Sequence, residues 1–219
     1  MSPENLQLFP APKRLRLTGK ASRLAALPEA DSLPVRTDPQ LPPQGYRLSI
    51  EPEALHVAAA DEAGGFYARQ TLQQIFRQCD GPPPCLEIED APDLPLRGIM
   101  LDVSRCKVPT LETLREWIHW MASLKLNQLQ LYIEHTFAFP GHETVWQEAS
   151  PYTPEDIRQI DTWCRDCHIE LVPNLNSFGH MERWLRHAPY RHLAECPEGF
   201  THPATGEAVP HGSTLYPDQ

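Results

Sequence analysis

Three features are missing from this 219-residue sequence, and each absence narrows the class of protein. No run approaches the roughly 20 consecutive apolar residues of a membrane-spanning helix, so we expect no membrane partner. The first residues lack the basic and apolar regions of a secretory signal peptide, which predicts a cytoplasmic protein. The net charge is -10 and no basic patch stands out, which argues against nucleic-acid binding.

The cysteines offer little support for a disulfide framework or a metal site. Six of them are spread widely through a chain that shows no secretion signal, so free thiols are expected. Cys164 and Cys167 have redox spacing but fall inside an expected helix. The stretch from His142 to Trp146 begins like a zinc-protease helix, yet Trp stands where the second His is required. We therefore expect no metal and no cofactor.

What is present fits an ordinary globular protein. Hydrophobic residues make up 41% and charged residues 22%, which leaves enough apolar material for a core. The length allows one large domain or two small ones. The 24 prolines cluster before residue 96 and after residue 188.

The first part of the chain, residues 1–93, predicts a small α+β domain. Alternating or apolar segments indicate short strands, and an apolar stripe through Tyr67, Leu72 and Ile75 indicates a helix that ends at the prolines after Gly81. The expected strands cover residues 15–18, 46–50, 55–60 and 86–89, and a single helical turn is expected over residues 22–27. A proline-containing linker, residues 90–95, follows.

The second part, residues 94–219, alternates strands with helices. The expected strands cover residues 96–105, 128–134 and 169–176, and the expected helices cover residues 109–124, 153–167 and 181–187. Residues 135–152 and everything after Ala188 are expected to be loop. Three βα units in succession predict a parallel α/β sheet.

Polar residues follow each of the three expected strands. They form the pairs Asp102 and Arg105, Glu134 and His135, and Asn176 and His180. The carboxyl ends of parallel strands meet at one edge, where α/β barrels carry their active sites. The sequence therefore predicts a ligand site at this edge.

The same residues resemble a known family. Leu96–Arg105 is similar to the opening barrel strand of family-20 glycoside hydrolases, the β-N-acetylhexosaminidases. Residues 120–127, 152–157 and 169–180 are similar to later barrel segments, and residues 63–72 to the α+β domain that precedes the barrel. The resemblance implies an α/β fold: a small α+β domain followed by the first three βα units of a truncated TIM (β/α)8 barrel.

The resemblance also implies retaining hydrolysis of terminal N-acetylhexosamine from a carbohydrate substrate. In this family the substrate's own acetamido group replaces the enzyme nucleophile. A Glu protonates the leaving group and a neighbouring Asp orients the acetamido group, both after the fourth barrel strand. The only Asp-Glu dipeptide here is Asp61-Glu62, in the first domain. We therefore expect a fragment of a longer enzyme, without catalytic residues, inactive alone, and able to self-associate through its open barrel edge.

Five residues form the predicted substrate-binding set: Arg97, Glu134, His135, Asn176 and His180. Arg97 matches the family arginine that binds sugar hydroxyls, and a structural ion pair is its alternative. His180 matches a histidine near the catalytic Glu, with loop stabilisation as the alternative. Asn176 stands where the family often has Asp.

The segment after the second strand departs from the family, which places two Asp residues where His135 and Thr136 stand. Glu134 is retained as a sugar contact. Asp102 and Arg105 suit either chemistry or a salt bridge that joins strand to helix. Phe137, Phe139 and Trp146 suit either stacking on sugar rings or a small loop core.

Two further interpretations remain open for the whole protein. One is a carbohydrate-binding or interaction module without catalysis. The other is a different sugar-processing barrel, such as an α-glucuronidase, with a similar N-terminal domain.

Overall fold

The computed structural model describes residues 6–29, 33–105 and 107–217. These residues form two compact units. The first contains the chain up to Arg97 together with Trp117–Asn127 and Cys167–Ile169. The second contains Gly98–Glu116, Gln128–Asp166 and the residues from Glu170 onward.

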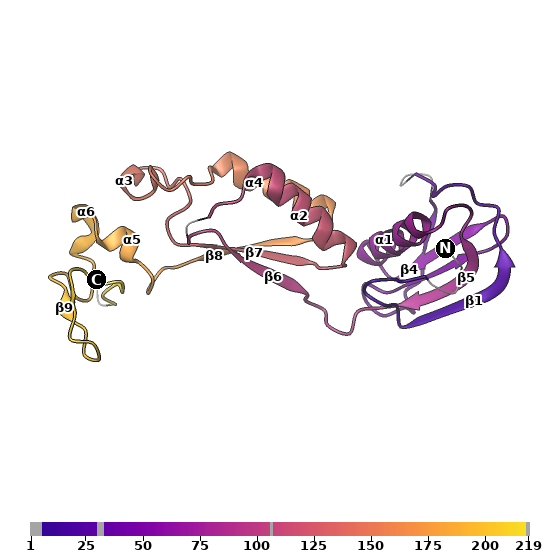
Figure 1. Cartoon of the computed structure of the whole chain (residues 1–219), viewed down its shortest axis with the longest axis horizontal. Coiled ribbons are helices and arrows are strands. Elements are labelled where there is room, and N and C mark those ends of the chain that lie inside the picture. Colours follow the sequence, from indigo (N-terminus) through magenta and orange to yellow (C-terminus); the bar gives the residue numbers. More distant parts are fainter. Residues whose placement is uncertain (1–5, 30–32, 106, 218–219) are drawn as a thin grey trace. The chain divides into compact units, whose positions relative to one another are not determined.

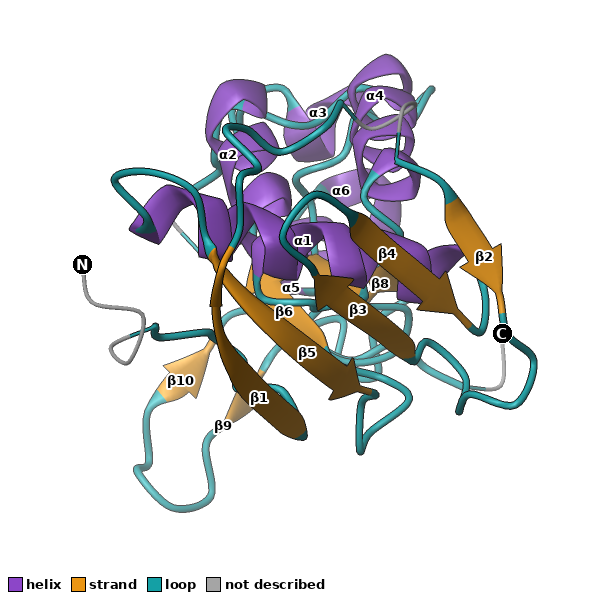
Figure 2. Ribbon diagram, turned by 90° about the vertical axis from the view of Figure 1, so that its right-hand side faces the viewer, coloured by secondary structure: helices purple, strands orange, loops and turns teal. Residues whose placement is uncertain are grey.

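The first unit is a five-stranded sheet with a helix on one face (Figure 2). The strand order is β1-β5-β3-β4-β2, with β2 parallel to β4 and the other pairs antiparallel. The strands are β1 (Arg14–Ala21), β2 (Val35–Thr37), β3 (Tyr46–Ile50), β4 (Leu55–Ala59) and β5 (Pro84–Asp90). The four strands expected from the sequence are present, and β2 is an addition. The helical turn expected over residues 22–27 is wrong, because this segment forms no helix.

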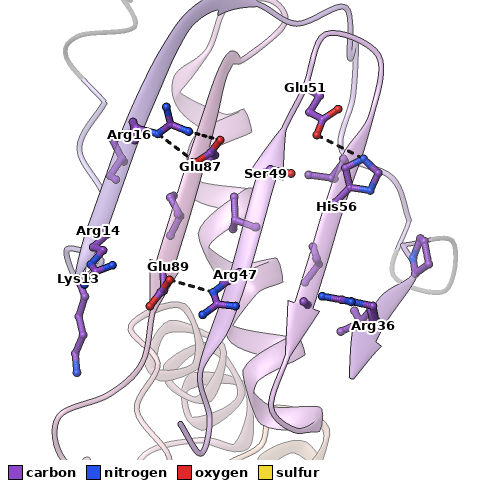
Figure 3. A pocket seen from close by; sticks show the side chains of 18 residues that line it. Lys13, Arg14, Arg16, Arg36, Arg47, Ser49, Glu51, His56, Glu87 and Glu89 are labelled. Carbon is purple, nitrogen blue, oxygen red and sulfur yellow. Dashed lines mark hydrogen bonds and ion pairs between the residues drawn. The ribbon is translucent and has the colours of Figure 1, made fainter. Parts of the chain in front are cut away.

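Helix α1 (Glu62–Gln78) buries the stripe that the sequence indicated, including Tyr67, Leu72 and Ile75. It begins at Asp61, whose carboxylate accepts a hydrogen bond from the Gly64 amide at 2.8 Å. The opposite face of the sheet carries ion pairs between neighbouring strands, Arg16 with Glu87 and Arg47 with Glu89 (Figure 3).

Within the first unit, a buried ion pair fixes Lys125 to the end of β5. The Lys125 ammonium lies 2.8 Å from the Asp90 carboxylate and 2.9 Å from the Tyr46 hydroxyl. The Tyr46 hydroxyl in turn lies 2.7 Å from the Thr71 hydroxyl. Burial alone would raise the pKa of Asp90, but the hydrogen bond and charge of Lys125, together with the hydrogen bonds from Tyr46 and the Lys13 amide, outweigh burial and lower that pKa.

The second unit contains a three-stranded parallel sheet in the order β6-β7-β8, with helices along one face (Figure 1). Its strands are β6 (Gly98–Asp102), β7 (Gln128–Ile133) and β8 (Glu170–Leu175), and its long helix is α4 (Pro154–Asp166). Helix α2 (Leu111–Ser123) is divided, with its residues up to Glu116 in this unit and those from Trp117 onward in the first. Helix α4 begins with reciprocal bonds between Thr153 and Asp156, a capping box. The three parallel βα units predicted from the sequence are confirmed.

The pleat of β7 assigns its side chains to two faces. Leu129, Leu131 and Ile133 are buried, whereas Gln130 and Tyr132 alternate with them and are only partly buried. Among the described residues, β6 and β8 each pair with β7 alone, so both are edge strands. Self-association through an edge stays a prediction.

The remaining elements of the second unit are short. They are α3 (Glu143–Trp146), α5 (Glu182–Leu185), α6 (Ala188–Arg191), β9 (Phe200–Thr201) and β10 (Ala208–Val209). Helix α5 confirms the helix expected over residues 181–187, although it is shorter. The sequence indicated loop at α3, α6, β9 and β10, which is wrong at these four elements. Such two- to four-residue elements are too short for a periodic pattern. Among the described residues, no helix has the length and apolar character to span a membrane.

Removing one partner of the buried ion pair should destabilise the first unit strongly. We expect Asp90→Asn to lower the free energy of unfolding by about 3–5 kcal/mol, because it leaves the Lys125 ammonium buried without a counter-charge. Urea unfolding measures this loss. The double variant Asp90→Asn with Lys125→Met should recover much of it, since it removes both charges. An unchanged urea midpoint for Asp90→Asn would contradict the proposed contribution of this ion pair to stability.

Candidate functional site

Five polar side chains meet at the carboxyl ends of the parallel strands in the second unit. Asp102 ends β6 and pairs in register with Tyr132 of β7. Arg105, Glu134 and Asn176 lie one to three residues beyond the ends of their strands. Since the strands are parallel and in register, their ends come together, as expected from the sequence.

Arg105 is the centre of this network. Its guanidinium bonds the Asp102 carboxylate and lies 2.8 Å from the Glu134 carboxylate. It also lies 4.9 Å from the centre of the Tyr132 ring and donates to the Tyr132 hydroxyl at 3.2 Å. The hydrogen bond that Arg105 donates to Tyr132 and the two carboxylates raise the pKa of Arg105 above its usual value.

Tyr132 links Glu134 and Asn176 to each other. Its hydroxyl donates to Glu134 at 2.8 Å and accepts from the Asn176 amide at 2.7 Å. The side chains of Asp102 and Arg105 are 37% and 51% exposed, so a ligand can reach both, whereas Glu134 is only 11% exposed. The network offers fixed donors and acceptors together, which suits a ligand rich in hydroxyl groups.

The backbone around Glu134 is held by the neighbouring loops. The Glu134 amide donates to the Ser104 hydroxyl at 2.7 Å, and that hydroxyl lies 3.0 Å from the Thr136 hydroxyl. The Glu134 carbonyl accepts from the Trp184 indole at 2.7 Å. Both bonds fix the segment after β7, so the carboxylate of Glu134 is positioned by its backbone as well as by Arg105.

The aromatic residues of the loop after β7 pack mainly on each other. The Phe137 and Phe139 rings lie 4.7 Å apart, and Phe139 lies 5.5 Å from Trp184. The Trp146 indole donates to the Phe139 carbonyl at 2.9 Å. These contacts favour the interpretation of a loop core over that of rings free to stack on sugars.

Of the five predicted binding residues, the structure brings Glu134 and Asn176 together through Tyr132. It does not bring His135 to them. His135 lies in the bend that follows β7, where its side chain is buried. Burial lowers the pKa of His135, and the positive charges of Arg183 and Arg186 lower it further. Its Nδ1 is buried without a hydrogen-bond partner.

Arg97 is also separate from this network. It precedes β6, at the opposite end of the strand from Asp102, and all five of its N–H groups are engaged. The acceptors are the carbonyls of Lys125, Leu94 and Pro95, the Gln44 amide oxygen and the Tyr67 hydroxyl. Within the described residues Arg97 forms no ion pair with a carboxylate, and a sugar contact of Arg97 stays a prediction. The bonding gives Arg97 a structural role in the first unit.

His180 lies in the loop after β8, where it is exposed and has a left-handed backbone with φ of 58°. No hydrogen bond joins it to the Arg105 network within the described part of the chain. A role of His180 in sugar binding therefore stays a prediction.

Tyr132 was missed in the sequence. The signal was available, because Tyr132 lies two residues before Glu134 and must therefore share its face of the strand. Asp102 and Arg105 form a salt bridge with each other, but it joins the end of β6 to the loop that follows and not to a helix as expected, and the chemical role of the two residues stays a prediction. Among the described residues, no three His, Cys, Asp or Glu side chains are grouped to hold a metal ion.

A small α+β unit and a parallel βα sheet with polar residues at its carboxyl edge fit the class of α/β-barrel proteins. Two family models match the chain. Residues 10–91 match glycosyl hydrolase family 20, domain 2, and residues 94–212 match the family 20 catalytic domain. The chain belongs to glycosyl hydrolase family 20.

Named relatives and solved structures are consistent with this family. A beta-hexosaminidase of Akkermansia muciniphila is 27% identical over 204 residues, which cover 84% of this chain and 40% of that protein. A solved family 20 beta-N-acetylglucosaminidase is 27% identical, with a TM-score of 0.69 over 96% of this chain and 51% of the other. The beta-N-acetylhexosaminidase of Bacteroides fragilis has a TM-score of 0.76 at 22% identity, covering 97% and 50%. The chain spans about half the length of these solved structures.

The depressed pKa of His135 makes stability depend on pH. The unfolded state binds the proton with a pKa near the usual ~6.5, above that of the folded state, so protonation favours unfolding. We expect the free energy of unfolding to be greatest above about pH 6.5 and to fall as the pH drops further. Urea unfolding across this range measures the slope.

The variant His135→Gln should show a smaller slope than the original protein, because the amide does not titrate. His180→Gln is the matched control, since His180 is exposed, and it should leave the slope unchanged. Equal slopes in the original chain and in His135→Gln would contradict the assignment to His135.

Proposed function

We propose that the Arg105 network binds the terminal sugar of a β-N-acetylhexosaminide, and that the whole protein removes this sugar by hydrolysis. The observation that carries the proposal is the convergence of Asp102, Arg105, Tyr132, Glu134 and Asn176 at the carboxyl edge of the sheet. Family 20 membership supports the hydrolytic chemistry, and it favours a hexosaminidase over the α-glucuronidase alternative.

The chemistry of the network fits an uncharged sugar. A carboxylate accepts hydrogen bonds from two adjacent hydroxyls, and a guanidinium donates to the oxygens of the same or a neighbouring hydroxyl. Asp102 and Arg105 neutralise each other, so neither must be left as an unpaired charge when a neutral ligand displaces water. Glu134 and Asn176, held through Tyr132, add an acceptor and a donor.

In the proposed reaction the acetamido oxygen of the substrate attacks the anomeric carbon while the bond to the leaving oxygen breaks. A carboxylic acid donates its proton to that oxygen, and water later opens the cyclic intermediate. The Asp61-Glu62 dipeptide is not suited to these roles, because Asp61 caps α1 and accepts bonds from the Gly64 and Gln44 amides. We assign the proton donor and its neighbouring Asp to a part of the protein outside these 219 residues.

The 219-residue chain alone should therefore be inactive. We expect no release of nitrophenol above background from nitrophenyl N-acetylglucosaminide, because no residue of this chain is assigned as the proton donor. An absorbance assay at substrate saturation, with an intact family 20 enzyme as positive control, measures this. Hydrolysis by the pure chain would contradict the assignment of the proton donor.

Arg105 should be required for sugar binding. We expect Arg105→Gln to weaken the binding of N-acetylglucosamine by about 10- to 100-fold, because each charged hydrogen bond contributes about 1.5–3 kcal/mol. NMR titration of the chain measures the affinity. Arg158→Gln changes the net charge equally on the exposed surface of α4 and is the matched control. Equal affinities of the two variants would remove the support for the site.

A further inference from the structure

A second cavity lies within the second unit, on the other side of the segment that carries Glu134. Its volume is about 550 Å³. The loop after β6, the start of the loop after β7, α3 with the residues that follow it, and α5 form its walls. The Arg105 network uses the side chain of Glu134, whereas this cavity is lined by the next side chain, His135.

The charges of this cavity are mainly positive, in a chain whose net charge is -10. Lys107, Arg183 and Arg186 line it, and none of the three forms an ion pair with a carboxylate in residues 6–29, 33–105 and 107–217. Glu148 is the one carboxylate on the wall. Three cations and one carboxylate leave an excess of positive charge around the cavity, which creates an attractive potential for an anion.

A buried group with an unused hydrogen-bonding atom adds a second, independent observation. His135 is only 7% exposed and lines the cavity, yet its Nδ1 has no hydrogen-bond partner. Burial lowers the pKa of His135 most, and the positive charges of Arg183 and Arg186, which line the same cavity, lower it further against the opposing effect of Glu134. Buried polar atoms in native proteins are nearly always paired, so this atom calls for a partner.

Hydroxyl groups complete the lining. Ser104 and Thr136 are buried on the wall, where their hydroxyls lie 3.0 Å apart, and Thr144 and Ser150 are exposed on it. Hydroxyls and guanidinium groups together are the usual partners of phosphate and sulfate oxygens. The volume lies within the range of small-molecule sites and exceeds the needs of a single ion.

We propose that this cavity binds a small molecule that carries a phosphate or sulfate group, held by Arg183, Arg186 and Lys107. The neutral sugar site at Arg105 is separate, so this proposal does not depend on the proposed hydrolase function. Ser104 is common to both, because it lines the cavity and accepts the hydrogen bond of the Glu134 amide. A ligand in the cavity would therefore lie next to the segment that positions Glu134.

The test is isothermal titration calorimetry of the chain with three probes: inorganic phosphate, N-acetylglucosamine 6-phosphate and neutral N-acetylglucosamine. We expect saturable binding of at least one phosphate probe that weakens as salt is added. Binding of both would show that the free ion suffices, and binding of the sugar phosphate alone would show that the group is recognised as a substituent. Absence of saturable binding by both phosphate probes would overturn the proposal.

Variants locate the site. Arg183→Gln and Arg186→Gln should each weaken binding of the phosphate probe by about tenfold or more, because each removes charged hydrogen bonds. Arg165→Gln removes the same charge from the exposed surface of α4, outside the cavity, and should leave the affinity unchanged. Far-UV circular dichroism checks that each variant keeps its fold.

Neither arginine of the cavity forms an ion pair in the described part of the chain, so their replacement should leave the fold intact. If Arg165→Gln weakened phosphate binding as much as the two cavity variants, the binding would depend on net charge alone, and the proposed site would be wrong. Neutral N-acetylglucosamine serves to separate the two sites, because its binding should respond to Arg105→Gln and remain unchanged in Arg183→Gln. A loss of neutral-sugar binding in Arg183→Gln would contradict the separation of the cavity from the sugar site.

Discussion

The register of three parallel strands governs the chemistry of this protein. Because Asp102 pairs with Tyr132, and Tyr132 with Asn174, the ends of β6, β7 and β8 lie at one level and bring their polar residues within hydrogen-bonding distance. A shift of one residue in any strand would turn its polar side chains to the opposite face. The Arg105 network is therefore a consequence of strand pairing before it is a consequence of individual side chains.

Two different environments lie a single residue apart in the bend that follows β7. Glu134 points to the face that Tyr132 occupies, where its carboxylate meets Arg105. His135 points to the buried face, among the cations of the second cavity. Only the backbone between them is shared, and Ser104 fixes it through the Glu134 amide. Two sites of different charge thus share one short segment.

The buried Lys125 shows how a polar group can organise the first unit. Its ammonium is taken out of water and depends on Asp90 and Tyr46 for compensation. Arg97 is likewise held by several acceptors of the first unit. They are the carbonyls of Leu94, Pro95 and Lys125, the Gln44 amide oxygen and the Tyr67 hydroxyl. A sequence does not distinguish such residues from ligand-binding residues. Both are charged side chains in an otherwise apolar segment, whether the charge serves folding or a ligand.

The sequence by itself determined the longer elements, their order and the parallel βα arrangement, because apolar periodicity and capping residues are local signals, as at Thr153 and Asp156. It also indicated Glu134 and Asn176, since the carboxyl edge of a parallel sheet follows from topology. Only the tertiary structure decided which side of the chain each residue faces beyond the strand end, and which acceptors engage Arg97. Those outcomes depend on contacts between residues distant in sequence, and no local pattern encodes them.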